Sequence, residues 1–404
     1  MEPYGKSGII ILCGGAISGL SVGIRQSFGL FLPPISADLG LGREVVGFSF
    51  GLVTLLWGIC APFAGAIADR FGTARVALVG TFFYCLGLYT IATATNEADL
   101  ITSGILVGFG ISGVGFTVVL GAVGRAAPPE RRSTALGLVS MGGSIGQFVS
   151  LPYAHLLISQ FGWAVSLLVL LVSASLMAPL AWGMRSKTRD PGHLLDQTLG
   201  QALYEAVHHR GFLLLTAGFF VCGFHVMFVS THLPAYLDDA GFAPWVGAAA
   251  LTLVGFANIF GVIGAARLGD YIEKRLALAI YYTLRSLVFF VFIMVPLTEA
   301  SVLIFAFTLG LLWLGTVPLT SGLVATLFGP RYMSMLFGIV FMSHSFGSFV
   351  GAWLGGYVYD AFGSYTAMWW ISIVLGLVSA AFHYPIKERP VPRLAAEAEA
   401  AAAA

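Results

Sequence analysis

The chain has 404 residues, of which 58% are hydrophobic and only 10% are charged. Soluble domains carry roughly 25% charged residues, so a water-soluble fold could not bury this much apolar surface, and lipid must form part of its surroundings. The formal net charge of +1 gives no sign of a nucleic-acid partner. All four cysteines lie inside apolar runs, a spacing that fits neither a disulfide framework nor a metal site: Cys13, Cys60, Cys85 and Cys222.

Twelve apolar runs follow one another, each long enough to cross a bilayer as a helix. They cover residues 8–32, 44–66, 74–95, 99–124, 133–157, 163–184, 211–236, 245–266, 276–296, 300–325, 334–357 and 364–384. The composition and these runs predict an all-α membrane protein with twelve transmembrane helices.

One longer polar stretch follows the sixth run and predicts a linker between two halves. We expect an N-terminal bundle at 1–184, a cytoplasmic linker at 185–210, a C-terminal bundle at 211–390 and a disordered tail or expression remnant at 391–404. Spaced apolar residues in the linker predict a short amphipathic surface helix: Leu194, Leu195, Leu199, Leu203 and Val207.

The basic residues predict the orientation, because cytoplasmic loops of membrane proteins are enriched in Lys and Arg. With the N-terminus in the cytoplasm, seventeen of the 20 Lys and Arg fall in cytoplasmic segments. Only Arg43 lies outside, while Arg25 and Arg285 lie within the membrane. Both termini are therefore expected in the cytoplasm, with the chain in the cell inner membrane.

The two halves repeat at an offset of 201 residues. Leu32-Pro33 matches Leu233-Pro234, and Phe161-Gly162 matches Phe362-Gly363. Further pairs in the same register are Asp38 with Asp239, Gly40 with Gly241, Asp69 with Asp270, Gly137 with Gly338, and Gly146 with Gly347. Because the register needs no gap, the sequence predicts a duplicated six-helix unit.

A conformational motif lies between the second and third runs, where the chain reads GAIADRFGTAR. Gly65 would permit close helix approach and Gly72 a tight turn, while Asp69 could accept from helix N-termini or pair with an arginine. Arg70 and Arg75 add the basic residues, and Asp270 marks a degraded copy in the second half. This string at this place resembles the signature of the major facilitator superfamily.

The resemblance covers the whole chain and implies two pseudo-symmetric six-helix bundles around a central cavity, lined by helices 1, 4, 7 and 10. Within the superfamily the chain looks closest to bacterial monocarboxylate-transporter-like proteins. That branch is suggested by Arg25-Gln-Ser-Phe28-Gly-Leu-Phe in helix 1, and by Cys222-Gly-Phe-His225 with His232-Leu-Pro-Ala-Tyr236-Leu in helix 7.

Polar groups inside the apolar runs are the candidate site residues, since a charge in hydrocarbon is costly and marks function by default. Arg25 on helix 1 offers a bidentate fork for a carboxylate. Arg285 is equally deep, but the resemblance makes its helix peripheral, so a structural role is at least as well supported. His225 lies near the repeat image of Arg25, and His225 or His344 could carry a proton. Other expected substrate contacts are Asn258, Gln147, Trp313 and Tyr281.

Two departures from the family pattern bear on the binding mode. Monocarboxylate transporters are expected to hold the carboxylate with an arginine on helix 8, where this chain has Val262, four residues after Asn258. A lysine found on helix 11 of some relatives would fall near His344. The predicted spans also contain no Asp or Glu, which leaves histidine, the substrate carboxylate or proton-free exchange for coupling.

The leading hypothesis is an alternating-access carrier of a small organic anion, such as a monocarboxylate, with proton symport. Two buried cations without a buried anion are the physical reason for an anionic solute. The alternatives are an exporter of amphipathic neutral or acidic compounds, favoured by the 13% aromatic content, and an anion exchanger. We expect no enzymatic activity, no cofactor, no metal site, and a functional monomer.

Overall fold

The computed structural model describes residues 5–126, 132–185, 198–329 and 333–394, and all regular elements in these ranges are helices. The first half holds α1 (Gly5–Gln26), η1 (Phe28–Phe31), α2 (Leu32–Leu39), α3 (Arg43–Phe71), α4 (Thr73–Ala92), α5 (Glu97–Val114), α6 (Phe116–Ala126), α7 (Arg132–Ser175) and α8 (Met177–Gly183). The second half holds α10 (Arg210–Asp239), α11 (Pro244–Tyr271), α12 (Lys274–Met294), α13 (Glu299–Leu311), α14 (Thr316–Phe328), α15 (Met333–Phe362) and α16 (Thr366–His383). Between them lies α9 (Leu199–Val207).

Twelve membrane spans follow from these helices, as predicted. Eleven stretches of the described chain are long and apolar enough to cross a membrane. One of them, Met141–Gly183, passes through Gly162, whose φ of 75° is not helical, so two helices meet there. This stretch therefore counts as two spans, and the predicted boundary between the fifth and sixth runs lies at that glycine.

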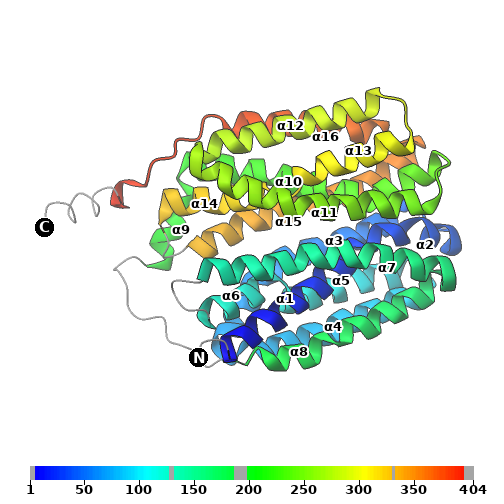
Figure 1. Cartoon of the computed structure of the whole chain (residues 1–404), viewed down its shortest axis with the longest axis horizontal. Coiled ribbons are helices and arrows are strands. Elements are labelled where there is room, and N and C mark those ends of the chain that lie inside the picture. The colour runs from blue at the N-terminus through cyan, green and yellow to red at the C-terminus, as the bar shows by residue number, and fades with distance from the viewer. Residues whose placement is uncertain (1–4, 127–131, 186–197, 330–332, 395–404) are drawn as a thin grey trace, which may run out of the picture.

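The helices form two layers that lie side by side (Figure 1). Helices from the first half make one layer and helices from the second half make the other, with the start of α1 and the end of the last described segment at the same end of the molecule. We call the opposite end, where α2 lies, the distal end. The layers meet where α3 packs on α15 and where α7 packs on α11.

The backbone repeats with the sequence register. Gly40 and Gly241 both adopt positive φ, at 63° and 83°, and so do Gly162 and Gly363, at 75° and 67°. Each pair is separated by 201 residues, and only glycine takes this conformation without steric cost. The repeat is therefore conserved in backbone geometry as well as in residue identity, which supports an ancestral six-helix unit.

The fourth and tenth spans are broken rather than continuous, which the hydropathy pattern did not predict. The first break is at Gly115, between α5 and α6, where a β-carbon would collide with the indole of Trp57. The second lies between Leu311 and Thr316, separating α13 from α14. Apolar composition is the same in broken and unbroken helices, so tertiary contacts decide where the backbone opens.

The helix expected in the linker is present as α9, which begins with a capping box. Thr198 accepts from the backbone of Gln201, whose side chain accepts in return from Thr198. Leu194 and Leu195 lie outside the described residues.

Candidate functional site

Arg25 lies near the end of α1 with only 9% of its surface exposed, between the two layers. One guanidinium nitrogen contacts the sulfur of Met227 on α10 at 3.1 Å, and the other donates to the amide oxygen of Gln26 at 2.8 Å. The ring of Trp57 lies 5.5 Å from the guanidinium carbon. The Nε atom has no partner among the described residues. The guanidinium therefore retains donor capacity that the protein leaves unused.

No carboxylate of the described residues pairs with this cation. The ion pairs in the described ranges join Arg43 with Asp239, Arg275 with Glu273, and Arg393 with Glu205. A buried charge without a counter-ion is costly, because desolvation is then offset only by neutral dipoles. Arg25 is therefore a buried cation that has no protein counter-ion among the described residues.

An amide chain extends from Arg25 toward the second half of the molecule. Gln26 donates from its side chain to the amide oxygen of Gln147 on α7, at 3.3 Å. Also on α7, the hydroxyl of Ser144 accepts a hydrogen bond from the side-chain amide of Asn258 on α11, at 3.5 Å. The structure thus brings together three of the predicted site residues, Arg25, Gln147 and Asn258, where the two halves meet.

The break in the tenth span is the second polar centre. Its backbone is held by Arg285, which is fully buried and donates through Nε to the carbonyl of Leu312 at 2.9 Å, and also to the carbonyl of Trp313. From the other side, Asn258 accepts from the backbone of Leu314 at 3.0 Å. Arg285 therefore satisfies the carbonyls at the end of α13, and its helix contributes to the interior rather than only to the periphery.

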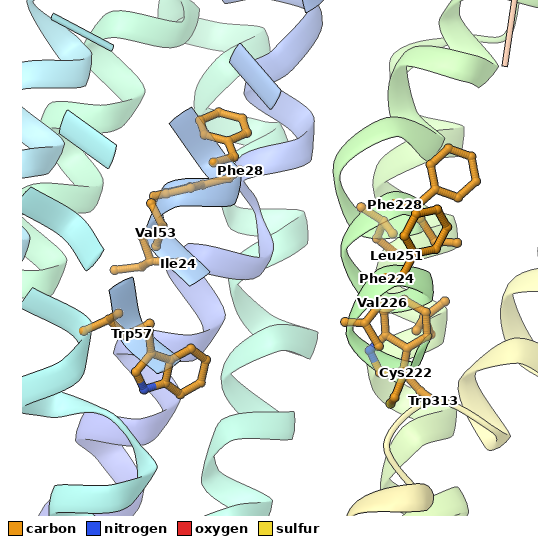
Figure 2. Packing of buried hydrophobic residues seen from close by; sticks show 14 of the residues in the cluster. Ile24, Phe28, Val53, Trp57, Cys222, Phe224, Val226, Phe228, Leu251 and Trp313 are labelled. Atoms are coloured by element: carbon orange, nitrogen blue, oxygen red, sulfur yellow. The ribbon is translucent and has the colours of Figure 1, made fainter. Parts of the chain in front are cut away.

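Trp313 and Tyr281 belong to this second centre. Trp313 is 1% exposed and lies in the break itself, close to Cys222 (Figure 2). The ring of Tyr281 packs so closely on Gly315 that a β-carbon there would meet it. Figure 2 also shows Ile24 and Trp57 of the first half, which belong to the same buried apolar cluster as Cys222 and Trp313.

The two histidines lie apart from Arg25. His225 contacts the backbone carbonyl of Ser372 on α16 at 2.8 Å and packs its ring 5.0 Å from that of Phe289. The position facing Arg25 is taken by Met227 instead, because two residues along a helix rotate the side chain by about 200°. His344 on α15 stacks against Phe341 with ring centroids 5.3 Å apart.

The residues of the conformational motif are only partly described. Gly72 ends α3 with φ of 95° and its N–H bonds to the carbonyl of Ala68, the tight turn that was expected. A β-carbon at Gly65 would lie 3.2 Å from Thr117 on α6, so the two helices approach closely there. Arg70 and Arg75 are exposed, while the side chains of Asp69 and Asp270 lie outside the described set.

The distal end carries a polar cluster that we did not predict as a site. Arg43, the first residue of α3, forms a bidentate pair with Asp239 at the end of α10, both contacts at 2.6 Å. The carboxylate of Asp360, on α15, accepts the backbone N–H groups of Arg43 and Glu44 at 3.1 and 2.7 Å. We call Arg43, Asp239 and Asp360 the distal clasp. It joins the two halves, and the one signal for it in the sequence was a lone basic residue among acidic loops.

A hydrogen-bonded chain of Tyr365 and His232 contacts Arg43 of the distal clasp. The Tyr365 hydroxyl accepts from Arg43 at 3.1 Å and lies 3.1 Å from Nδ1 of His232, whose Nε2 donates to the carbonyl of Ala352 at 2.7 Å. This donor order fixes the tautomer, with Nδ1 accepting from the phenol. Burial raises the pKa of Tyr365, opposed by Arg43, so the phenol keeps its proton.

Comparison with known proteins gives one family. The sequence model of the Major Facilitator Superfamily matches residues 11–342. The chain is 26% identical over 373 residues to monocarboxylate transporter 13 of Bos taurus, covering 89% of this chain and 84% of that protein. It is also 26% identical to the uncharacterized MFS-type transporter YhjX of Escherichia coli K12, over 85% of this chain and 87% of the relative.

Two solved structures share the fold. A bacterial homolog of the human lysosomal transporter Spinster, crystallised in an inward-facing and unoccupied conformation, aligns with a TM-score of 0.79 at 14% identity, covering 97% of this chain and all (100%) of that one. A D-xylose–proton symporter aligns with a TM-score of 0.74, also at 14% identity, over 96% of this chain and 100% of the other.

Proposed function

The chain belongs to the Major Facilitator Superfamily, close to its monocarboxylate-transporter-like members, and on that basis we propose that it carries a small organic anion of the monocarboxylate class by alternating access. Transport itself is a property of the family, so the chain is a multi-pass membrane transporter and not an enzyme. Proton symport, the inner membrane and cytoplasmic termini complete the proposal. The distribution of Lys and Arg supports the orientation and makes the distal end the outer one.

One observation supports an anionic substrate: Arg25 is a buried guanidinium between the halves with no carboxylate partner in the described chain. A planar fork with free N–H groups suits a carboxylate, which can accept two parallel bonds. The amides of Gln147 and Asn258 lie along the same interface and could bond other polar groups of the substrate. The names of the relatives agree with this substrate class.

Alternating access has a physical basis in the same contacts. The distal clasp holds the outer ends of the halves together, so the outer path is closed in this state. A substrate anion at Arg25 would interact with α1 of one half while Met227 of the other half moves against it. Binding between two bodies is the arrangement that lets rocking expose the site to either side.

The test is uptake in proteoliposomes. We would load purified protein into liposomes and measure a panel of radiolabelled short-chain monocarboxylates, with and without an inward proton gradient, beside tetraphenylphosphonium as a lipophilic cation. Gradient-stimulated carboxylate uptake is the expected result. Uptake that needs an anion inside the vesicle would identify an exchanger instead, and uptake of the cation alone would refute the anion proposal.

Arg25→Gln tests the binding residue. Loss of the charge-assisted bonds, worth about 1.5–3 kcal/mol, should weaken carboxylate affinity roughly ten- to hundredfold. Arg25→Lys should recover part of the affinity, since it keeps the charge and loses the fork. Arg210→Gln, at the exposed start of α10, is the matched control and should bind normally. Unchanged affinity in Arg25→Gln would remove Arg25 from the site.

A further inference from the structure

The thiol of Cys222 on α10 lies in a polar environment that is unusual for a membrane helix. It is fully buried, with a guanidinium nitrogen of Arg285 3.5 Å from the sulfur and the hydroxyl of Thr316 3.2 Å from it. Two further titratable side chains lie near the thiol, Tyr282 on α12 and His344 on α15, but neither the Tyr282 hydroxyl nor His344 Nδ1 forms a hydrogen bond among the described residues. The sulfur of Cys222 therefore contacts a cation from α12 and a hydroxyl from α14.

The donors around the sulfur favour an anion. Arginine has no acceptor, so the sulfur must accept in the contact with Arg285. Thr316 is the first residue of α14, a 13-residue helix, and a helix N-terminus carries a partial positive charge. A neighbouring arginine and a helix N-terminus are the two settings that stabilise a thiolate. Here both act on one atom.

The environment of Arg285 also favours an ionised Cys222. The guanidinium is 0% exposed, and its other recorded hydrogen bonds go to neutral carbonyls of Leu312 and Trp313. None of the ion pairs in the described ranges includes it. An ionised Cys222 would supply the counter-ion that a buried charge requires.

The repeat shows that this pair is a departure from the duplicated unit. The positions 201 residues earlier are Ser21 and Tyr84, and there the hydroxyl of Tyr84 donates to the backbone carbonyl of Ser21 at 2.9 Å. The equivalent positions in the first half, on α1 and α4, thus hold neutral groups. In the second half they hold an ionisable thiol against a permanent cation.

We propose that Cys222 is the proton-binding site of this transporter, carrying a thiolate paired with Arg285 and taking up one proton during the transport cycle. The role of Cys222 in coupling proton uptake to transport rests on the proposed function, whereas the thiolate itself does not. The step is a simple protonation, in which the sulfur lone pair takes a proton from the aqueous phase and no other bond forms or breaks. It needs no carboxylate in the membrane.

A chain of contacts connects this site to the substrate site. Protonation removes the counter-ion of Arg285, which holds the carbonyls of the broken tenth span at Leu312. Two residues further on, Leu314 is held by Asn258, whose amide reaches Ser144 in the first half. A change in the position of the guanidinium therefore acts on the backbone segment that touches the interface between the halves.

Infrared spectroscopy tests the thiolate without any transport assay. A variant in which Cys13, Cys60 and Cys85 are replaced by alanine retains one thiol, whose S–H stretching band is present only when sulfur is protonated. We expect no band at mildly alkaline pH, a band on acidification, and a band at both pH values once Arg285→Gln is added. The matched control keeps Cys85 alone, whose thiol donates to the neutral carbonyl of Leu171 at 3.8 Å, and should show the band throughout. A Cys222 band as strong as that of Cys85 at alkaline pH would overturn the thiolate.

Transport measurements test the coupling separately. Cys222→Ser keeps a small polar group that does not ionise, so proton-driven accumulation should be lost while carboxylate exchange at equal pH continues. Cys85→Ser should keep both activities. Retained proton-driven accumulation in Cys222→Ser would reject Cys222 as the coupling site. If the infrared result holds and no carboxylate is carried at all, the proposed substrate fails while the acid–base site stands.

Discussion

The side chain of Asn258 forms one hydrogen bond within its own half and one across to the other half. Its amide oxygen accepts from the backbone of Leu314 at 3.0 Å, and its amide nitrogen reaches the hydroxyl of Ser144 at 3.5 Å. The first bond satisfies a backbone donor that the broken helix leaves without an intrahelical partner. The second is long and therefore weak.

Asn258→Ala should consequently cost more stability than Ser144→Ala. The first variant leaves a part-buried N–H of Leu314 unsatisfied, a penalty of about 1–3 kcal/mol at most, whereas the second removes only the weaker contact. Thermal unfolding of both variants in the same detergent measures the difference. Equal losses in the two variants would mean that the bond across the halves, rather than the broken helix, determines the role of Asn258.

Residues of the candidate site could be picked out from the sequence where their polarity distinguishes them from the apolar residues around them. Arg25, Gln147 and Asn258 stand out because each is polar within an apolar run. Met227 could not be found in this way, since a methionine in an apolar helix carries no signal. His225 was paired with Arg25 from sequence register, but the rotation of α10 directs it toward α16. Helix rotation is set by packing, and hydropathy does not report it.

At the level of elements, the start of α10 depends on the neutral form of a histidine. His209 caps this helix by accepting from the backbone N–H of Phe212 at its Nδ1, at 3.2 Å. Burial lowers the pKa of His209, and the nearby Glu205 opposes that shift. A protonated imidazole cannot accept this bond and would place a positive charge at the positive end of the helix.

The cap should therefore weaken in acid. Because the folded-state pKa lies below the unfolded value of about 6.5, the stability contribution is present above that value and is lost as the pH falls below it. His209→Asn keeps a capping acceptor that does not titrate. Comparing unfolding midpoints of both proteins between about pH 5 and about pH 8 should show an extra loss, of about 1 kcal/mol, for the unmodified chain. Parallel pH curves would contradict this role.

The number and order of the membrane spans could be predicted from the sequence. The breaks within the fourth and tenth spans could not. Runs of apolar residues and the excess of Lys and Arg in alternate loops depend on the bilayer, which acts on every span alike. At Gly115 the backbone packs against the indole of Trp57, and before Thr316 it forms hydrogen bonds with Arg285 and Asn258. Such contacts arise only when distant helices meet.

For the whole molecule, the distal clasp joins the two halves at the distal end. Arg43 pairs with Asp239 in a bidentate contact and lies 3.8 Å from the centre of the Tyr359 ring, so one side chain of the first half contacts two helices of the second. The carboxylate of Asp360 binds backbone N–H groups of α3, so this contact survives changes to the Arg43 side chain.

Reversing one charge of the pair should separate the distal ends of the halves, and reversing both should bring them together again. Arg43→Asp and Asp239→Arg each place like charges together, while the double variant restores an attractive pair. The Arg43 and Asp239 side chains are 13% and 32% exposed, so solvent screens the pair and we expect a bias of roughly 1 kcal/mol, about fivefold in the equilibrium between joined and separated distal ends. Spin labels at the exposed positions Ala37 and Ala243 would report the separation of the halves by pulsed electron resonance. The single variants should gain a population at longer distance, and the double variant should lose most of it. A double variant as open as either single one would show that the closed state is held by helix packing, with the ion pair a bystander.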